Sequence, residues 1–172
     1  MYGEKAMEVV LRKAKGKFES AIDDLQKGRY DSCISNLYYS AFQTVTAYMI
    51  AQGQATSKHT HARAYVNREL ANTGLISKES AKLYNRLMDD RSDADYNVES
   101  FDQTEAEKML EGVKLFNLEI RGLLVKGIQT YHDKQGGKRR GRNIVFVFSV
   151  DEITVCHCGD LGHVLSEEQV SA

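Results

Sequence analysis

The stretch Tyr84-Asn-Arg-Leu-Met-Asp-Asp-Arg91-Ser-Asp-Ala-Asp95-Tyr96 decides how the rest of this chain is interpreted. Its apolar side chains continue the period of Leu83, which predicts the last turns of an amphipathic helix. The helix then runs into a polar cluster that gathers a guanidinium, two carboxylates and a phenol: Arg91, Asp93, Asp95 and Tyr96. Such a helix end is either fixed by ion pairs within the protein or is a site for an anionic ligand.

Two long amphipathic helices precede this stretch. Apolar residues recur at three- and four-residue steps over residues 7–25, and Gly28 then suits the left-handed conformation that ends a helix. Asp31 is predicted to cap the N-terminus of a second helix, whose apolar period over residues 34–49 is the strongest in the chain. The short connection between the two helices predicts an antiparallel helical hairpin.

Three further helices complete the pattern. A weaker period over residues 59–72 predicts a third helix that ends at Gly74, and Ser77 is expected to begin the helix that carries the opening stretch. Thr104, followed three residues later by a glutamate, has the spacing of a capping box for a fifth helix. Five such helices predict an all-α, up-down helical bundle over residues 1–126.

The overall composition is that of an ordinary globular protein. The net charge is −1, and once residues 127–172 are set aside the bundle carries 18 basic and 18 acidic residues. Any contact with nucleic acid would therefore be local. No apolar run reaches the length of a membrane span, no signal-like core opens the chain, and the three cysteines lack the spacing of a disulfide framework. We expect a cytoplasmic protein with no membrane contact.

Five short motifs in a fixed order carry a resemblance to a known family. Residues 4–125 resemble the HEPN domain family through Gly28-Arg-Tyr-Asp, Asn36-Leu-Tyr-Tyr39-Ser-Ala-Phe42, Ser57-Lys-His59, Thr73-Gly-Leu-Ile-Ser77 and Arg91-Ser-Asp-Ala-Asp95-Tyr96. The resemblance implies a small helical bundle, usually a homodimer formed through the faces that carry the arginine motif. It also implies an RNA- or nucleotide-associated role, with a toxin–antitoxin pair that includes a nucleotidyltransferase partner as one family setting.

Catalysis by the arginine motif is one function that this resemblance leaves open. In active members a histidine follows the arginine after four to six intervening residues; it would move a proton while the arginine stabilises charge on the phosphate. Here Tyr96, Asn97 and Val98 stand at those positions. A metal-independent ribonuclease would have to combine Arg91 with Asp95 or Tyr96. Tyrosine is a weak base at pH 7, and the arginine would lower the pKa of the aspartate.

Binding without cleavage is the function that we expect. The planar fork of arginine suits a phosphate and an aromatic ring can stack on a base, so Arg91, Tyr96 and Tyr39 are the candidate ligand contacts. The alternative is structural, with Arg91 paired to an aspartate of the same helix end. His59 and His61 are interpreted as capping and surface residues, because no third metal ligand is apparent near them.

The sequence changes character at residue 127. Glycines become frequent, a basic loop covers residues 134–142, and residues 144–148 and 153–156 are predicted as two strands. The first strand is apolar throughout, which suits a strand covered on both faces. Ser166, followed by two glutamates, is expected to open a short helix. A basic run of this kind is typical of a solvated loop, although it could meet phosphates.

Residues 127–170 resemble part of a metallo-β-lactamase-fold hydrolase. The resemblance rests on His132-Asp, the Gly136-Gly137 loop, Arg140-Gly-Arg-Asn143 and His157-Cys-Gly-Asp160-Leu-Gly-His163. It implies that His132 and Asp160 are metal ligands, with zinc as the expected ion only if the segment retains a site. The His-x-His-x-Asp-His cluster of that fold does not occur in the sequence. We therefore expect residues 127–172 to be an incomplete fragment, with a remnant metal-dependent hydrolase as the alternative, and no cofactor otherwise.

Overall fold

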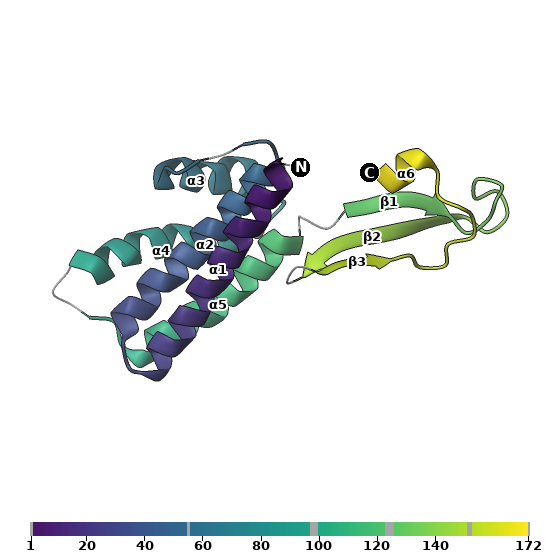
Figure 1. Cartoon of the computed structure of the whole chain (residues 1–172). Helices are drawn as coiled ribbons and strands as arrows, with labels where there is room; N and C mark the ends of the chain where they lie inside the picture. The colour runs from purple at the N-terminus through teal and green to yellow at the C-terminus, as the bar shows by residue number, and fades with distance from the viewer. Residues whose placement is uncertain (1, 55, 97–99, 123–125, 151–152, 172) are drawn as a thin grey trace. The chain divides into compact units, whose positions relative to one another are not determined.

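The chain forms two compact units, residues 1–123 and 124–172, in the computed structural model. The structure describes residues 2–54, 56–96, 100–122, 126–150 and 153–171, without the side chains of 2–4, 93–96, 126, 148–150, 153–154 and 171. The first unit contains the helices α1 to α5, and the second contains a small sheet and a short helix (Figure 1).

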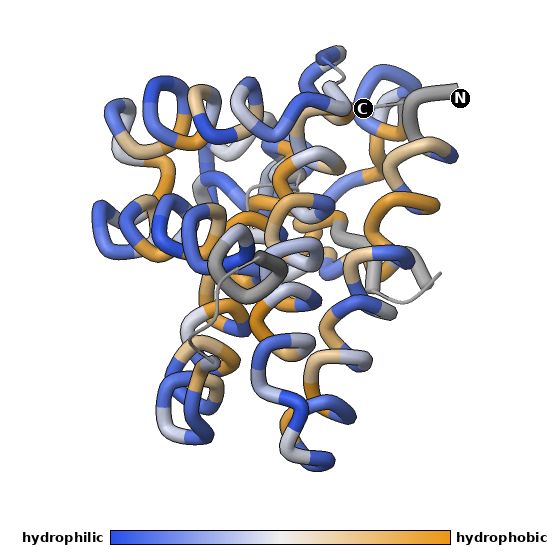
Figure 2. The backbone as a smooth tube through the Cα atoms, turned by 90° about the vertical axis from the view of Figure 1, so that its left-hand side faces the viewer, coloured by the Kyte–Doolittle hydropathy of each residue, from blue (hydrophilic) through white to orange (hydrophobic). Residues whose placement is uncertain are grey.

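The helix α2 is the centre of the first unit. It spans Tyr30–Ala51 and packs against α1 (Tyr2–Gln26), α4 (Lys78–Tyr96) and α5 (Gln103–Gly122). Hydrophobic and hydrophilic residues alternate along the helices as their period requires (Figure 2). The largest fully buried side chains include Tyr38, Tyr84, Phe116, Ile34, Leu37, Leu87 and Ile120. The predicted all-α bundle of five helices is therefore confirmed.

Several predicted helix ends are confirmed by their local geometry. Gly28 has φ 69° and Gly74 has φ 76°, the left-handed conformation that glycine adopts without steric cost. Ser77 Oγ accepts the Ser80 backbone N–H at 3.0 Å, so it caps α4 as predicted. None of the described helices is long and apolar enough to cross a membrane.

Two predicted N-caps are wrong. Asp31 lies inside the first turn of α2, where its Oδ1 accepts the Phe101 backbone N–H at 2.9 Å and fixes the segment before α5. The capping box of α5 involves Asp102 rather than Thr104. Asp102 Oδ1 accepts the Glu105 N–H at 2.8 Å, and Glu105 Oε2 accepts the Asp102 N–H at 3.2 Å. A carboxylate thus replaces the predicted hydroxyl in the same reciprocal arrangement.

The predicted third helix is divided into an α-helical and a π-helical part. The helix α3 spans His59–Tyr65 and is followed by η1, a π-helix over Val66–Ala71. Arg63 fixes this segment to α4, because its Nε donates to Asn85 Oδ1 at 2.9 Å and its Nη1 lies 2.9 Å from Asp89 Oδ1. The wide π turn keeps Val66 and Leu70 buried.

The second unit is an antiparallel three-stranded sheet in the order β1-β2-β3. The strands span Lys126–Tyr131, Arg142–Val150 and Ile153–His157, and the helix α6 spans Glu167–Ser171. The strand β1 was not predicted. Within β2, Val145 is buried whereas Ile144 and Phe146 are 49% and 44% exposed, so the prediction of a strand covered on both faces is wrong. Ser166 Oγ accepts the Gln169 N–H at 3.2 Å and opens α6 as expected.

Candidate anion-binding site

Arg91 and Tyr39 meet across two helices of the bundle. Arg91 lies in the last turns of α4 and Tyr39 lies in the middle of α2, 52 residues away. The Arg91 Nη2 donates to the Tyr39 phenol oxygen at 2.8 Å, and the guanidinium carbon lies 5.3 Å from the centroid of the ring. Both side chains are half-buried, so the pair reaches the surface. The structure therefore brings together two of the three residues that the sequence nominated as ligand contacts.

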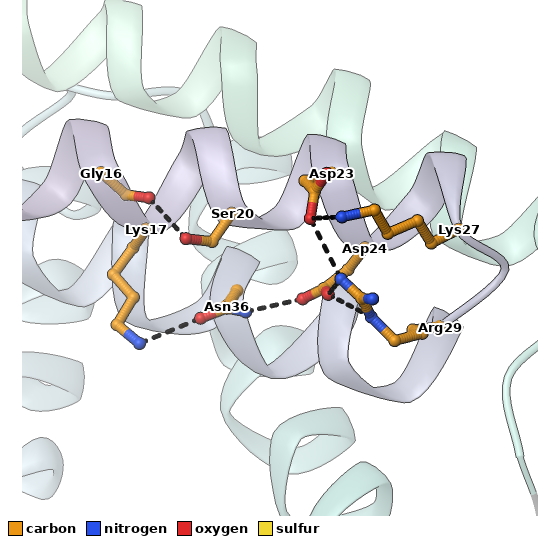
Figure 3. Close-up of polar contacts among 8 residues, drawn as sticks. All are labelled: Gly16, Lys17, Ser20, Asp23, Asp24, Lys27, Arg29 and Asn36. Atoms are coloured by element: carbon orange, nitrogen blue, oxygen red, sulfur yellow. Dashed lines mark hydrogen bonds and ion pairs between the residues drawn. The ribbon is translucent and has the colours of Figure 1, made fainter.

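A second cation faces the same aromatic ring. Lys17 of α1 places its Nζ 5.5 Å from the Tyr39 centroid and donates to Asn36 Oδ1 at 3.0 Å. Asn36 Nδ2 in turn donates to Asp24 Oδ2 at 2.8 Å, and Arg29 Nε donates to Asp24 Oδ1 at 2.7 Å (Figure 3). This chain of contacts runs from the α1–α2 corner to the ring and orients the ammonium group of Lys17.

His59 adds an imidazole to the site. It is the first residue of α3, its Nδ1 lies 2.6 Å from the Tyr38 phenol oxygen, and its ring centroid lies 4.3 Å from that of Phe42 and 6.1 Å from that of Tyr39. Burial and the nearby positive charge of Arg91 lower the pKa of His59 below its usual value. The imidazole is therefore neutral at pH 7.

One hydrogen bond joins the imidazole of His59 to the Tyr38 phenol, and its direction is coupled to the tautomer of the imidazole. Burial raises the pKa of Tyr38 to about 12, so this phenol keeps its proton at neutral pH. A protonated phenol can donate to Nδ1, which leaves the imidazole proton on Nε2, or it can accept from an Nδ1–H, which leaves a lone pair on Nε2. Among the residues that the structure describes, none hydrogen-bonds to Nε2, so this nitrogen can contact a ligand.

We name the five half-buried residues that reach this surface the Arg91 cluster: Lys17, Tyr39, Phe42, His59 and Arg91. The cluster combines two fixed cations, a neutral imidazole and aromatic faces. A guanidinium and an ammonium can hold a phosphate, and an aromatic ring can hold a base or ribose. The charges are local, as the balanced composition of the bundle requires.

The structure tests only part of the predicted site. The side chains of Asp95 and Tyr96 lie outside its described part, as does that of Asp93, so their predicted roles stay predictions. His59 was interpreted as a capping and surface residue; it is half-buried, begins α3, and its ring packs on Phe42 within the cluster. Its neighbour His61 is exposed, as predicted. Helical spacing gave no indication of His59, because its proximity to Arg91 depends on how α3 and α4 pack.

The predicted metal ligands of the second unit are also close to each other. His132 Nδ1 lies 3.3 Å from Asp160 Oδ2 and 2.7 Å from the Asp160 backbone oxygen. The approach depends on Gly162, where a Cβ would overlap the His132 carbonyl. Among the described residues, no group of three or more His, Cys, Asp or Glu could hold a metal ion. The metal-dependent hydrolase therefore stays a prediction from resemblance, with a donor set too small for zinc.

The comparisons with known proteins agree with this fold. The HEPN domain family matches residues 7–122, and the chain belongs to this family. A UPF0332 protein from Thermotoga maritima is 37% identical over 93 residues, which cover 54% of this chain and 70% of that protein. A UPF0332 protein from Archaeoglobus fulgidus is 25% identical over 111 residues, which cover 64% and 88% of the two chains. The family match ends before the second unit, so the resemblance of residues 127–170 to a metallo-β-lactamase-fold hydrolase stays a prediction.

Proposed function

We propose that the bundle is a nucleotide- or RNA-binding module that contacts a phosphate at Arg91. The observation that carries the proposal is the convergence of Arg91 and Lys17 on the Tyr39 ring, with both cations held in place by hydrogen bonds. Preorganised cations lose little side-chain entropy when a ligand binds. The exposed faces of Tyr39 and Phe42 add a surface for a base or ribose.

The test is the affinity of the full chain for labelled single-stranded RNA and for ATP and GTP, measured by fluorescence anisotropy and calorimetry. Arg91→Ala removes a charge-assisted contact of about 1.5–3 kcal/mol, so affinity should fall roughly tenfold or more. Arg86→Ala is the matched control, because Arg86 lies on the same helix and pairs with Asp90 at its own surface. Equal affinities of the two variants, with helicity intact, would assign Arg91 a structural role only.

We also propose that the chain forms a homodimer through the face that carries the Arg91 cluster, and that a nucleotidyltransferase-type protein is its partner in a toxin–antitoxin setting. Membership of the HEPN family supports this, since the resemblance implies both arrangements. Sedimentation equilibrium should give twice the monomer mass. Arg91→Glu should weaken the dimer, because it removes the hydrogen bond to Tyr39 and reverses the charge of this face in both subunits. A monomer at all concentrations would remove this part of the proposal.

A ribonuclease is the second candidate, and His59 is the observation that favours it. Sequence alone offered Asp95 or Tyr96 as partners of Arg91, whereas the structure places a neutral imidazole in the same cluster. For this activity the imidazole proton must lie on Nδ1 and be donated to the Tyr38 phenol oxygen, so that the Nε2 lone pair would accept a proton from a ribose hydroxyl while Arg91 stabilises charge on the phosphate. The reaction needs no metal ion.

The test compares the rates at which the wild-type chain, His59→Ala and His61→Ala cleave single-stranded RNA, which distinguishes a ribonuclease from a protein that only binds RNA. Loss of proton transfer typically costs about 100-fold or more, so His59→Ala should abolish most cleavage. His61→Ala, an exposed change in the same helix, should leave it intact. Because the pKa of His59 is lowered, a base role predicts a rate that rises with pH below 6.5 and is level at neutral pH. Intact RNA after long incubation with the wild-type chain would reject the ribonuclease.

A further inference from the structure

The loop between β1 and β2 is wound around a single carboxylate. Asp133 Oδ1 accepts the backbone N–H groups of Gln135 at 2.7 Å and Gly137 at 3.0 Å. Its Oδ2 accepts those of Arg139 at 3.0 Å and Arg140 at 2.8 Å. These four bonds lower the pKa of Asp133 to about 2, so it stays ionised under all ordinary conditions. The one acidic side chain of the loop therefore accepts its hydrogen bonds from the backbone of the loop itself.

The loop backbone is as closely fixed as the carboxylate. Gly136, Gly137 and Gly141 have φ of 66°, 79° and 87°. A Cβ on Gly137 would lie 2.8 Å from the Tyr131 ring and 2.9 Å from the Gly141 oxygen, so only glycine fits there. The Gly141 N–H also bonds to the Gly137 oxygen at 2.9 Å. The loop is a preorganised turn and not a flexible charged segment.

All the cationic side chains of this turn are exposed: Lys134, Lys138, Arg139, Arg140 and Arg142. No ion pair joins any of them to another residue in the described part of the chain. Beside the turn is a hollow of about 610 Å³, whose walls include Lys134, Tyr131 and His163 as well as the acidic Glu168. The Tyr131 and His163 rings lie 5.9 Å apart, centroid to centroid. The turn thus carries five exposed cations, one of which, Lys134, lies beside an aromatic surface.

We propose that this turn, residues 133–142, is a second nucleic-acid contact that binds the phosphate backbone of a single strand independently of its sequence. Its arginines suit phosphates, and the adjacent rings suit an unpaired base. Apart from Asp133, its side chains are Lys, Arg and Gln between glycines, with no apolar group to insert into a membrane. The proposal does not depend on the Arg91 cluster, which lies in the other unit.

The salt dependence of binding is the first test, because it counts phosphate contacts. The full chain and a fluorescein-labelled 12-nucleotide uridine strand are titrated between 50 and 200 mM salt. Each phosphate contact contributes about 0.7 to the slope of log K against log salt. Arg139→Gln with Arg140→Gln should therefore reduce the slope by about 1.4 and weaken binding several-fold. Lys78→Gln with Lys82→Gln on α4 removes the same charge from the bundle and should change neither.

Asp133→Asn separates a preorganised turn from simple charge attraction. The substitution makes the chain more positive, so charge alone predicts tighter binding. It also replaces one carboxylate oxygen by an N–H donor and thereby removes the acceptor of two of the four backbone N–H groups, so a preorganised turn predicts binding that is several-fold weaker. Hydrogen exchange would show whether this variant unfolds the sheet. If it does, the salt dependence of the Arg139→Gln and Arg140→Gln double variant alone tests the proposal. Tighter binding by a folded Asp133→Asn would overturn the proposal.

Three further comparisons complete the test. A deoxyuridine strand should bind comparably, whereas preference for RNA would assign a 2′-hydroxyl contact to the hollow. Polyglutamate of equal charge, or vesicles with 30% phosphatidylserine, binding as tightly as the strand would overturn the choice of nucleic acid. The loop variants should show the same slope change in an Arg91→Ala background. A failure at Arg91 would then leave this contact standing, and a failure here would leave the proposed function of the bundle untouched.

Discussion

The two units of the chain are stabilised by different means. The bundle buries large apolar side chains such as Phe116, Leu37 and Tyr84 from helices far apart in sequence. The described buried side chains of the second unit are Val145, Thr130 and Asn143. Asn143 Nδ2 donates to Thr130 Oγ1 and to the Cys158 oxygen, both at 2.8 Å. A periodic apolar pattern therefore describes one unit well, whereas the other depends on directional hydrogen bonds that such a pattern does not contain.

The largest expected effect concerns the apolar core of the bundle. Phe116 is fully buried and stacks against Tyr84 with ring centroids 5.5 Å apart. Phe116→Ala should lower the free energy of unfolding of the bundle by about 3–5 kcal/mol, because it removes apolar contacts and leaves a cavity. Leu118→Ala on the same helix, where the side chain is 59% exposed, should change it by less than about 0.5 kcal/mol. Chemical denaturation followed by circular dichroism measures both, and similar losses would contradict the assigned core.

A smaller effect is expected from the polar core of the second unit. Asn143→Ala leaves the Thr130 hydroxyl and the Cys158 carbonyl without their partner, which should cost about 1–3 kcal/mol. Hydrogen exchange should show faster opening of β1 and β2 with unchanged protection in α2. Gln135→Ala, at an exposed loop position, is the control. Equal protection in both variants would mean that apolar contacts dominate here too.

The next effect in size is the response of the second unit to acid, through Asp133. The pKa of Asp133 is lowered to about 2 in the folded protein, against an ordinary value of 3.8. Its stabilising contribution is present above the unfolded pKa and is lost as pH falls from about 4 through about 2. NMR shifts of the Gln135 and Gly137 amide protons should titrate in this range. Asp133→Asn removes the transition, and a midpoint near 4 would show that the backbone bonds to this carboxylate are weak.

The smallest expected effect is a change in the pKa of His59. His59 should titrate below the ordinary pKa of a histidine, because burial and Arg91 both disfavour its charged form. Arg91→Ala removes the second of these causes and should raise the pKa of His59. The ring proton shifts of His59 measure this change. An unchanged His59 in this variant would place the two side chains farther apart than the structure does.

The sequence predicts the bundle well because its stability comes from the pattern that was analysed. Helical periods placed the five helices, and glycine and serine marked three of their ends correctly, at Gly28, Gly74 and Ser77. The errors at Asp31 and Thr104 arise because a side-chain acceptor near a helix start has several nearby N–H donors to choose from. In each case the choice depends on a tertiary contact or on a neighbouring carboxylate.

The site is less predictable than the fold. Arg91 and Tyr39 were nominated from sequence, but their hydrogen bond joins residues 52 positions apart. The packing of His59 on Phe42 was not predicted, because it depends on the position of α3. The strand β1 was missed for a related reason: residues 126–131 have little apolar alternation, and their strand character comes from pairing with β2. The Arg91–Tyr39 hydrogen bond, the packing of His59 and the strand β1 all depend on contacts between different helices or strands.

The π-helix η1 has a consequence for how this fold tolerates changes in length. A π turn holds one residue more than the α turn it replaces, and within η1 the residues Arg68 and Glu69 are both exposed. Removing one of them would return the segment to α-helical geometry while Val66 and Leu70 could still reach the core by a small rotation. The contact of Arg63 with α4 precedes the π turn and would be kept. Deletions of a single residue should therefore be accepted in this turn more readily than anywhere in α2.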